Sequence, residues 1–220
     1  MNWSGLGPLL LQGTKDTLYL TLWSGLLAYI LGLPLGILLV VTKRGNIMPA
    51  PSFNAALGAV INFLRSIPFI ILLAMLFPVT RAVMGRAIGT RSVIFPLFIS
   101  AFPYVARMVE GALSEVNEGI LEAALSMGST NSQIIFKVLL PEAIPTLVNG
   151  AAIVFTSILG YTAMASAAGG EGLGALAITK GYNQQKMDVL YTTCIAMVLL
   201  VQLITVSGTR LTHRLDHRKK

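Results

Sequence analysis

Residues 115–145 read EVNEGILEAALSMGSTNSQIIFKVLLPEAIP, and this is the one long stretch of the chain with the pattern of a soluble, amphipathic helix pair. Its polar positions recur every three or four residues, which is the period of a helix, and its apolar residues lie on the opposite face. A glycine interrupts the pattern in the middle, at Gly128. The sequence therefore predicts two helices, about 117–127 and about 131–140, joined by a turn at Gly128. The polar positions are Glu118, Glu122, Ser126, Thr130, Gln133 and Lys137.

The second of these helices has clear start and stop signals. Thr130 followed by Gln133 is a capping-box pattern, and Pro141 is expected to end the helix. An alternative is a helix pair that lies on the bilayer surface. The polar face carries a single basic residue, Lys137, whereas interfacial helices are usually rich in Lys and Arg on that face. The pattern therefore favours a surface that docks onto another protein.

The rest of the chain has the composition of a polytopic membrane protein. Of its 220 residues, 55% are hydrophobic and only 11% are charged, against about 25% charged residues in soluble domains. The net charge of +7 then reflects the basic residues that fix membrane topology rather than binding to nucleic acid. The single cysteine, Cys194, excludes an internal disulfide and a cysteine-based metal cluster. The N-terminal residues 1–13 lack the basic region of a cleavable signal peptide.

Uncharged or nearly uncharged runs of about 20 residues or more indicate transmembrane helices. We expect an all-α fold in which residues 1–220 form a single transmembrane domain with five such helices and a coupling segment at about 114–142. The predicted helices lie at about 17–42, 53–79, 92–113, 143–168 and 189–209.

Several residues inside these spans carry specific expectations. Gly32 and Gly36 have the spacing that lets another helix approach closely. Arg107 and Glu110 are three residues apart, so they share a helix face and form a candidate structural ion pair. Arg65 lies deep in the second span, and two interpretations stay open for it: a side chain that snorkels to the cytoplasmic surface, or one that faces the interior of the subunit or the side on which a partner protein docks.

The distribution of Lys and Arg gives an orientation. With five spans the termini lie on opposite sides, and the side that holds the C-terminal tail carries more basic residues. The positive-inside rule therefore predicts an external N-terminus and a cytoplasmic C-terminus, which also places residues 114–142 in the cytoplasm. The loop that holds Arg81, Arg86 and Arg91 argues against this orientation, and the sequence assigns it no role.

A resemblance arises from the spacing within the opening stretch. The pattern begins with Glu122-Ala123-Ala124, continues after three residues with Gly128, and ends after nine more with Val138-Leu139-Leu140-Pro141. This pattern resembles the EAA motif of ABC importer permeases, with Val138 in place of Ile. The branch of this family that transports D- and L-methionine is similar over nearly the whole chain, although that branch commonly has a Pro where this chain has Asn131. The segments that carry this likeness are 17–21, 65–69, 106–110, 137–143 and 160–164.

The resemblance implies a type I ABC importer permease in the bacterial inner membrane. Its expected partners are a second copy of the chain, two copies of a cytoplasmic ABC ATPase and an extracytoplasmic methionine-binding lipoprotein, with membrane lipid around it. ATP and Mg²⁺ are expected on the ATPase, because this chain has no phosphate-binding G-x-x-x-x-G-K-[ST] motif and needs no cofactor of its own. The residues implied in coupling to the ATPase are Glu122, Ala123, Ala124, Gly128, Val138, Leu140 and Pro141.

Some assignments remain alternatives. Glu122 either hydrogen-bonds backbone amides beyond Gly128 or is merely solvated, and Met164 is either a gate residue or part of the packing. His213 and His217 have helical spacing for a metal pair but no third ligand, so no metal site, no catalytic residue and no enzyme activity is predicted. The other function classes are a channel or carrier for small solutes that needs no ATPase, and an ABC permease for another amino acid.

Overall fold

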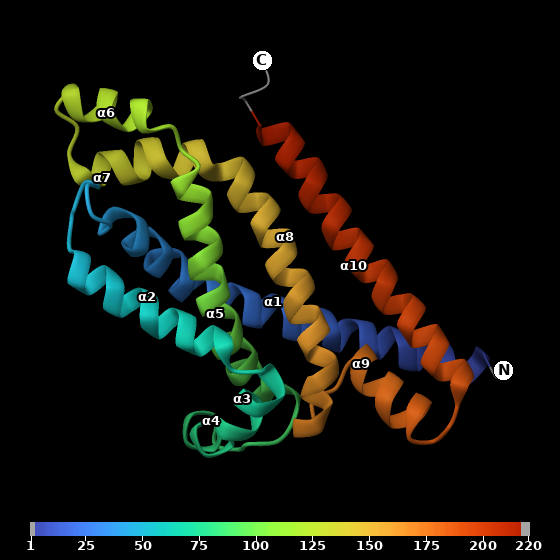
Figure 1. Cartoon of the computed structure of the whole chain (residues 1–220). Helices are drawn as coiled ribbons and strands as arrows, with labels where there is room; N and C mark the ends of the chain where they lie inside the picture. Colours follow the sequence, from blue (N-terminus) through green and yellow to red (C-terminus); the bar gives the residue numbers. More distant parts are fainter. Residues whose placement is uncertain (1–2, 217–220) are drawn as a thin grey trace.

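The computed structural model describes residues 3–216, and every regular element in them is helical. Four helices are long and apolar enough to cross a membrane: α1 (Trp3–Val41), α5 (Thr90–Ser114), α8 (Leu140–Met164) with the helical turns on either side of it, and α10 (Met187–Leu215). They run side by side as a bundle (Figure 1). The all-α, multi-span architecture predicted from composition is confirmed.

Helices α1 and α5 run in parallel and share the most extensive interface in the bundle. A Cβ atom added to Gly36 would lie 2.6 Å from the carbonyl oxygen of Ala106 and 2.5 Å from the Cβ of Val109. A Cβ on Gly32 would lie 2.7 Å from the carbonyl oxygen of Phe102. These glycines therefore let the α1 backbone touch α5, as expected from small residues at membrane helix interfaces.

We predict that Gly36→Ala destabilises the protein because the new methyl group meets backbone atoms that cannot move away. Overpacking of this kind costs about 1–3 kcal/mol. Thermal unfolding of the detergent-solubilised protein measures the effect. Gly160→Ala in α8 is the control, because nothing lies within 4 Å of a Cβ at that position. Equal shifts in the Tm of the two variants would contradict the proposed packing role of Gly36.

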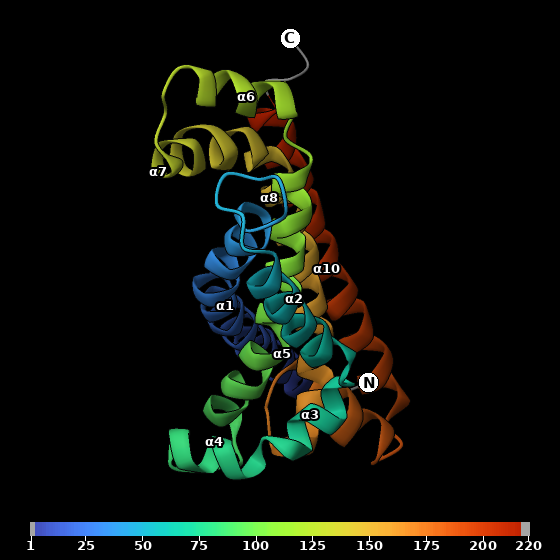
Figure 2. The same cartoon turned by 60° about the vertical axis from the view of Figure 1, so that its left-hand side comes forward.

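The segment that was expected to form one helix at about 53–79 consists of three helices. These are α2 (Pro51–Ser66), α3 (Phe69–Met75) and α4 (Phe77–Met84). The axes of α2 and α3 differ by 99°, so the pair forms either a broken membrane span or a re-entrant loop. Figure 2 shows α3 and α4 lying across the end of the bundle rather than along it. The prediction of one continuous helix over this range is therefore wrong.

The break has a local cause in Pro68. Proline disfavours a helical conformation in the residue before it, and Ile67 is extended, with φ −81° and ψ 120°. Proline also has no N–H to donate to the carbonyl of Leu64. The Ile67 N–H donates to that carbonyl instead, at 3.4 Å. The Ser66 hydroxyl donates to the carbonyl of Asn62 at 2.8 Å and leaves the Leu64 carbonyl to Ile67.

The two ends of the bundle carry different structures. At one end, α6 (Glu118–Ser126) and α7 (Asn131–Gln133) lie across the bundle near the C-terminus (Figures 1 and 2). At the other end lie the N-terminus, α4, α9 (Leu173–Leu176) and the turns that follow α8 and α9. These turns are a 3₁₀ turn over Ala165–Ala168 and a π-helix over Ala177–Tyr182.

The first and last helices extend beyond the spans expected from hydropathy. Helix α1 begins at Trp3, and the polar pair Gln12 and Asp16 lies on it, with the Gln12 amide donating to the Asp16 carboxylate at 3.0 Å. Helix α10 continues through Arg210 and Arg214 of the basic tail. Hydropathy marks only the apolar part of such helices, and the polar ends remain helical outside it.

A candidate coupling surface at one end of the bundle

Helix α6 is fixed at both ends by its own sequence. At its start the side chain of Asn117 accepts a hydrogen bond from the N–H of Gly119 at 2.8 Å, which is an N-cap. At its end Gly128 adopts φ +76°, and its N–H donates to the carbonyl of Leu125 at 2.9 Å while the Ser129 N–H donates to the carbonyl of Ala124 at 3.1 Å. This pair of bonds is a Schellman motif, which turns the chain sharply after the helix.

The capping box predicted at Thr130 is present. The Thr130 hydroxyl accepts from the N–H of Gln133 at 3.4 Å, and the Gln133 side chain accepts from the N–H of Thr130 at 2.8 Å. Two backbone N–H groups at the start of α7 are thereby paired. The turn between α6 and α7 therefore has a defined shape, set by the Schellman motif on one side and the capping box on the other.

The prediction that Pro141 ends the second helix is wrong. The chain stays helical from Asn131 through Pro141 into α8, by way of a π-helix over Ile134–Leu139. Pro141 has no N–H for the carbonyl of Lys137, so an α-helical pattern would be broken there. The wider π-pattern begins before the proline, with the N–H of Leu140 paired to the carbonyl of Ile135, five residues earlier. The change of register lets the helix continue instead of stopping.

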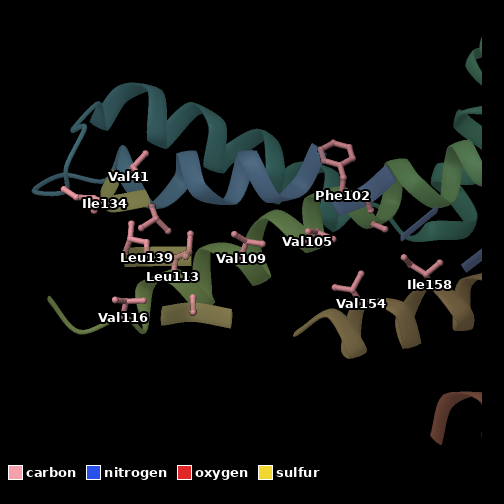
Figure 3. Packing of buried hydrophobic residues seen from close by; sticks show 14 of the residues in the cluster. Val41, Phe102, Val105, Val109, Leu113, Val116, Ile134, Leu139, Val154 and Ile158 are labelled. Carbon is pink, nitrogen blue, oxygen red and sulfur yellow. The ribbon is translucent and has the colours of Figure 1, made fainter. Parts of the chain in front are cut away.

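The helix pair is attached to the bundle by buried apolar side chains. Three of these side chains lie in the main hydrophobic cluster, each with an exposed fraction of 3% or less. They are Ala124 of α6 and, in the π-helix, Ile134 and Leu139. Figure 3 shows Ile134 and Leu139 beside Val41 of α1 and Leu113 of α5. The pair is thus part of the folded core on one side, so its position depends on the positions of α1 and α5.

The pair also exposes large apolar residues. Met127, beside the turn, is 79% exposed, and Phe136 of the π-helix is 67% exposed. Ile120 and Leu125 of α6 are also exposed. Side chains of this size outside the bundle indicate a surface that packs against another protein. This surface is called the docking face below and consists of Ile120, Met127 and Phe136.

The structure brings the residues of the EAA pattern together on this helix pair, at different depths. Glu122, Ala123, Gly128 and Pro141 are exposed, Val138 and Leu140 are half-buried, and Ala124 is buried. Within residues 3–216 the Glu122 carboxylate forms no hydrogen bond or ion pair, so it does not bind the amides beyond Gly128. It lines a cavity of about 390 Å³, with Glu118 on its own helix and with Lys43 and Arg44 across from it.

An ion-pair network lies directly behind the coupling surface. Glu110 of α5 contacts the Arg107 guanidinium at 2.6 Å and the Lys43 ammonium, just after α1, at 3.0 Å. Arg107 also donates to the carbonyl of Gly58 in α2 at 2.8 Å. Lys43 reaches the hydroxyl of Ser114 at 3.4 Å. The network therefore joins α1, α2 and α5 at the end that carries the coupling surface.

The sequence predicts one half of this network and not the other. The pairing of Arg107 with Glu110 follows from their spacing on one helix. Lys43 is far away in the sequence and marks only the end of the first apolar run, so no local signal connects it with Glu110. The contact depends on the parallel packing of α1 against α5, which brings the ends of both helices to the same level.

The remaining candidate residues lie at the opposite end of the bundle. Met164 is the last residue of α8 and is 47% exposed. Arg81, Arg86 and Arg91 are exposed and have no carboxylate partner among the described residues. The same residues contain no cluster of three or more His, Cys, Asp or Glu side chains that could hold a metal ion. His217 of the proposed histidine pair lies outside the described range.

Comparisons with known proteins identify the family. The model of the family described as "Binding-protein-dependent transport system inner membrane component" matches residues 32–220. A probable D-methionine transport system permease protein MetI of Vibrio cholerae is 45% identical over 210 residues, covering 96% of this chain and 93% of the relative. The D-methionine transport system permease protein MetI of Escherichia coli is 47% identical over 156 residues, covering 71% of this chain and 72% of the relative.

Solved structures agree with this assignment. A chain of the MetNI methionine ABC transporter in an inward-facing conformation superimposes with a TM-score of 0.93 and 42% identity, covering 95% of this chain and 97% of that one. A chain of an amino acid ABC transporter superimposes with a TM-score of 0.72 at 21% identity, which shows a shared fold. The hinged helix pair in EAA spacing, the apolar bundle and these matches together show that the chain belongs to the inner-membrane permeases of binding-protein-dependent ABC importers, close to the methionine permeases.

Proposed function

We propose that this chain is the membrane-spanning subunit of an ATP-driven importer of methionine, in both its D- and L-forms. The observation that carries the proposal is the coupling surface itself: two capped helices in EAA spacing, rooted in the core and exposing the docking face. Methionine as the substrate is supported by the similarity to D-methionine permeases and to a chain of the MetNI methionine transporter. The chain would act as a homodimer with two copies of an ABC ATPase.

The docking face is proposed to lie in the cytoplasm, where ATP is available. The end of the bundle that carries it also holds Lys43, Arg44, Arg107 and the basic C-terminal part of α10, in agreement with the positive-inside rule. The N-terminus and Met164 would then lie on the outer side, where a methionine-binding lipoprotein delivers the substrate. Met164 is the proposed gate residue there, because its flexible apolar side chain is exposed at the outer end of α8.

The geometry gives the coupling surface a direct mechanical link to the membrane. The ATPase would hold ATP and Mg²⁺ and seat the docking face in a surface cleft. When the two ATPases close on ATP, their motion would displace the helix pair. Because the chain is helical without a break from Asn131 to Ala168, that displacement would pass into α8 and change the opening of the pathway between two copies of the chain.

Uptake by proteoliposomes tests the proposal. The vesicles contain this chain, its ATPase and the binding lipoprotein, and the measurement is accumulation of radiolabelled L- and D-methionine with and without MgATP. We expect accumulation of both isomers that requires MgATP and the ATPase. Equal uptake without the ATPase would overturn the ATP-driven mechanism in favour of a channel or carrier. Preferential uptake of another amino acid, supplied as a competitor, would overturn methionine as the substrate.

A further inference from the structure

Arg65 is a charged residue that lies beside the middle of a membrane-spanning helix, α5. It lies one residue before the end of α2, next to the break at Pro68. Its guanidinium carbon is 5.6 Å from the centre of the Tyr104 ring, and Tyr104 is near the middle of α5, which spans Thr90–Ser114. Snorkelling to the cytoplasmic surface is therefore not what the structure shows. The guanidinium is instead held at mid-bundle by an aromatic face.

This guanidinium has no anionic partner within the described part of the chain. Arg65 is exposed, and within residues 3–216 it forms no hydrogen bond and no ion pair. An Arg at the centre of a bilayer is costly when it faces lipid, and such residues almost always face a bundle interior or a water-filled cavity. The exposed side of α2 at Arg65 is thus expected to line a polar space rather than the lipid.

The neighbouring surface of α2 supports a polar space. Ser52, Asn62 and Ser66 are all exposed, and with Ala55 and Ala59 they recur at spacings of three and four, so they share one face of the helix. A face of small and polar residues, exposed along a membrane helix, fits contact with water and a transported solute better than contact with acyl chains. Arg65 borders this face and is the only charged residue of α2.

A second copy of the chain offers no carboxylate at this depth. The chain contains nine acidic residues, and none of them lies near the middle of a membrane-spanning helix. Glu110 is near the coupling end of α5 and already binds Lys43 and Arg107. The remaining acidic residues lie towards helix ends or in the connections: Asp16, Glu115, Glu118, Glu122, Glu142, Glu171, Asp188 and Asp216. An anion that binds Arg65 must therefore come from outside the homodimer.

We propose that Arg65 binds the α-carboxylate of the amino acid as it passes through the permease. The planar guanidinium suits a carboxylate because it can donate two parallel hydrogen bonds. This inference rests on the proposed function and adds to it a recognition site within the membrane, on α2 beside Tyr104. Such a site would select α-amino acids over uncharged solutes, and it would leave discrimination between side chains to other residues.

The test compares Arg65→Gln and Arg65→Lys with the wild-type complex in proteoliposomes, with Arg86→Gln as the matched control. Arg86 is an exposed arginine at the outer end with no carboxylate partner in the described chain. Two quantities are measured: kcat/KM for methionine uptake, and photolabelling of the permease by a diazirine analogue of methionine that keeps its amino and carboxylate groups. Labelled peptides are mapped by mass spectrometry.

We expect wild-type label on peptides of α2 and the middle of α5. A hydrogen bond to a charged group contributes about 1.5–3 kcal/mol, so Arg65→Gln should lower both this label and kcat/KM by about 10- to 100-fold. Arg65→Lys keeps the charge but loses the paired geometry, so it should fall in between. Labelling of the binding lipoprotein and uptake by Arg86→Gln should be unchanged.

Each other outcome has a defined meaning. If the wild-type complex imports methionine and Arg65→Gln imports it equally well, this inference alone is overturned. If the wild-type complex imports no methionine, the proposed function is overturned as well. Size-exclusion chromatography reports assembly of the permease with its ATPase. If Arg65→Gln does not assemble while Arg65→Lys is fully active, the arginine anchors the helix to a lipid phosphate, and the proposed site is wrong.

Discussion

Gly128→Pro is expected to separate ATP hydrolysis from transport, lowering the methionine imported per ATP hydrolysed by at least about tenfold. Gly128 has φ +76°, whereas proline is confined to φ near −65°. The substitution also removes the N–H that donates to Leu125 in the Schellman motif. A left-handed conformation costs a non-glycine residue about 1–2 kcal/mol, and the lost hydrogen bond adds about 1 kcal/mol. The turn must therefore open and displace α6 from α7.

The measurement is the ratio of uptake to phosphate release in proteoliposomes. Gly85→Pro is a matched control, because Gly85 also has φ +76° and nothing lies within 4 Å of a Cβ at either glycine. Gly85 follows α4 at the other end of the bundle, so its variant should keep the wild-type ratio. Gly128→Ala, which keeps the N–H, should fall in between. A wild-type ratio in Gly128→Pro would contradict the role of the turn in coupling.

Glu110→Gln should cause the second large effect, a loss of stability at the coupling end of the bundle. The Glu110 side chain is 13% exposed, and its charge is shared by Lys43, which is 43% exposed, and Arg107, which is 23% exposed. Removing one partner of a buried ion pair costs about 3–5 kcal/mol. Partial exposure of the two cations lowers our expectation to about 2–3 kcal/mol. For a chain of this length, that corresponds to a fall in Tm of roughly 4–12 °C.

Thermal unfolding of the solubilised protein measures this effect, with Glu115→Gln as the control. Glu115 is exposed and accepts a hydrogen bond from the Thr146 hydroxyl at 3.0 Å, so its substitution should cost well under half as much. The double variant Lys43→Gln with Glu110→Gln should lose less free energy of unfolding than the sum of the losses of the two single variants. Glu110→Gln alone leaves the Lys43 charge unpaired, and Lys43→Gln removes that charge. A Glu110→Gln variant as stable as Glu115→Gln would disprove the stabilising role of the network.

The parts of the coupling surface that could be predicted from the sequence are those with local causes. The turn at Gly128 and the capping box at Thr130 depend on residues within a few positions of each other, so their spacing is sufficient to recognise them. The same holds for the pair of Arg107 and Glu110. The burial of Ala124 and the exposure of Phe136 could not be assigned in this way, because each depends on which side of the helix pair meets α1 and α5.

The errors arose at prolines, for two different reasons. At Pro68 the chain breaks, because Ile67 takes the extended conformation that proline favours in its neighbour. At Pro141 the chain continues, because the preceding turn takes the π-pattern. Both residues are prolines inside apolar or amphipathic runs, and nothing in the runs themselves distinguishes the two outcomes. The difference lies in the preceding turn, which widens into the π-pattern before Pro141, where Ile134 and Leu139 are buried in the core.

The π-helix over Ile134–Leu139 also fixes a rotational phase. A π-turn holds about one residue more than an α-turn over the same length, and each residue of an α-helix corresponds to a rotation of about 100°. Helix α7, before this turn, and the membrane-spanning part of α8, after it, are therefore offset in azimuth by that extra residue. The helical register at this turn thus sets the direction in which the docking face points relative to the transport pathway. No flexible joint is needed between the two.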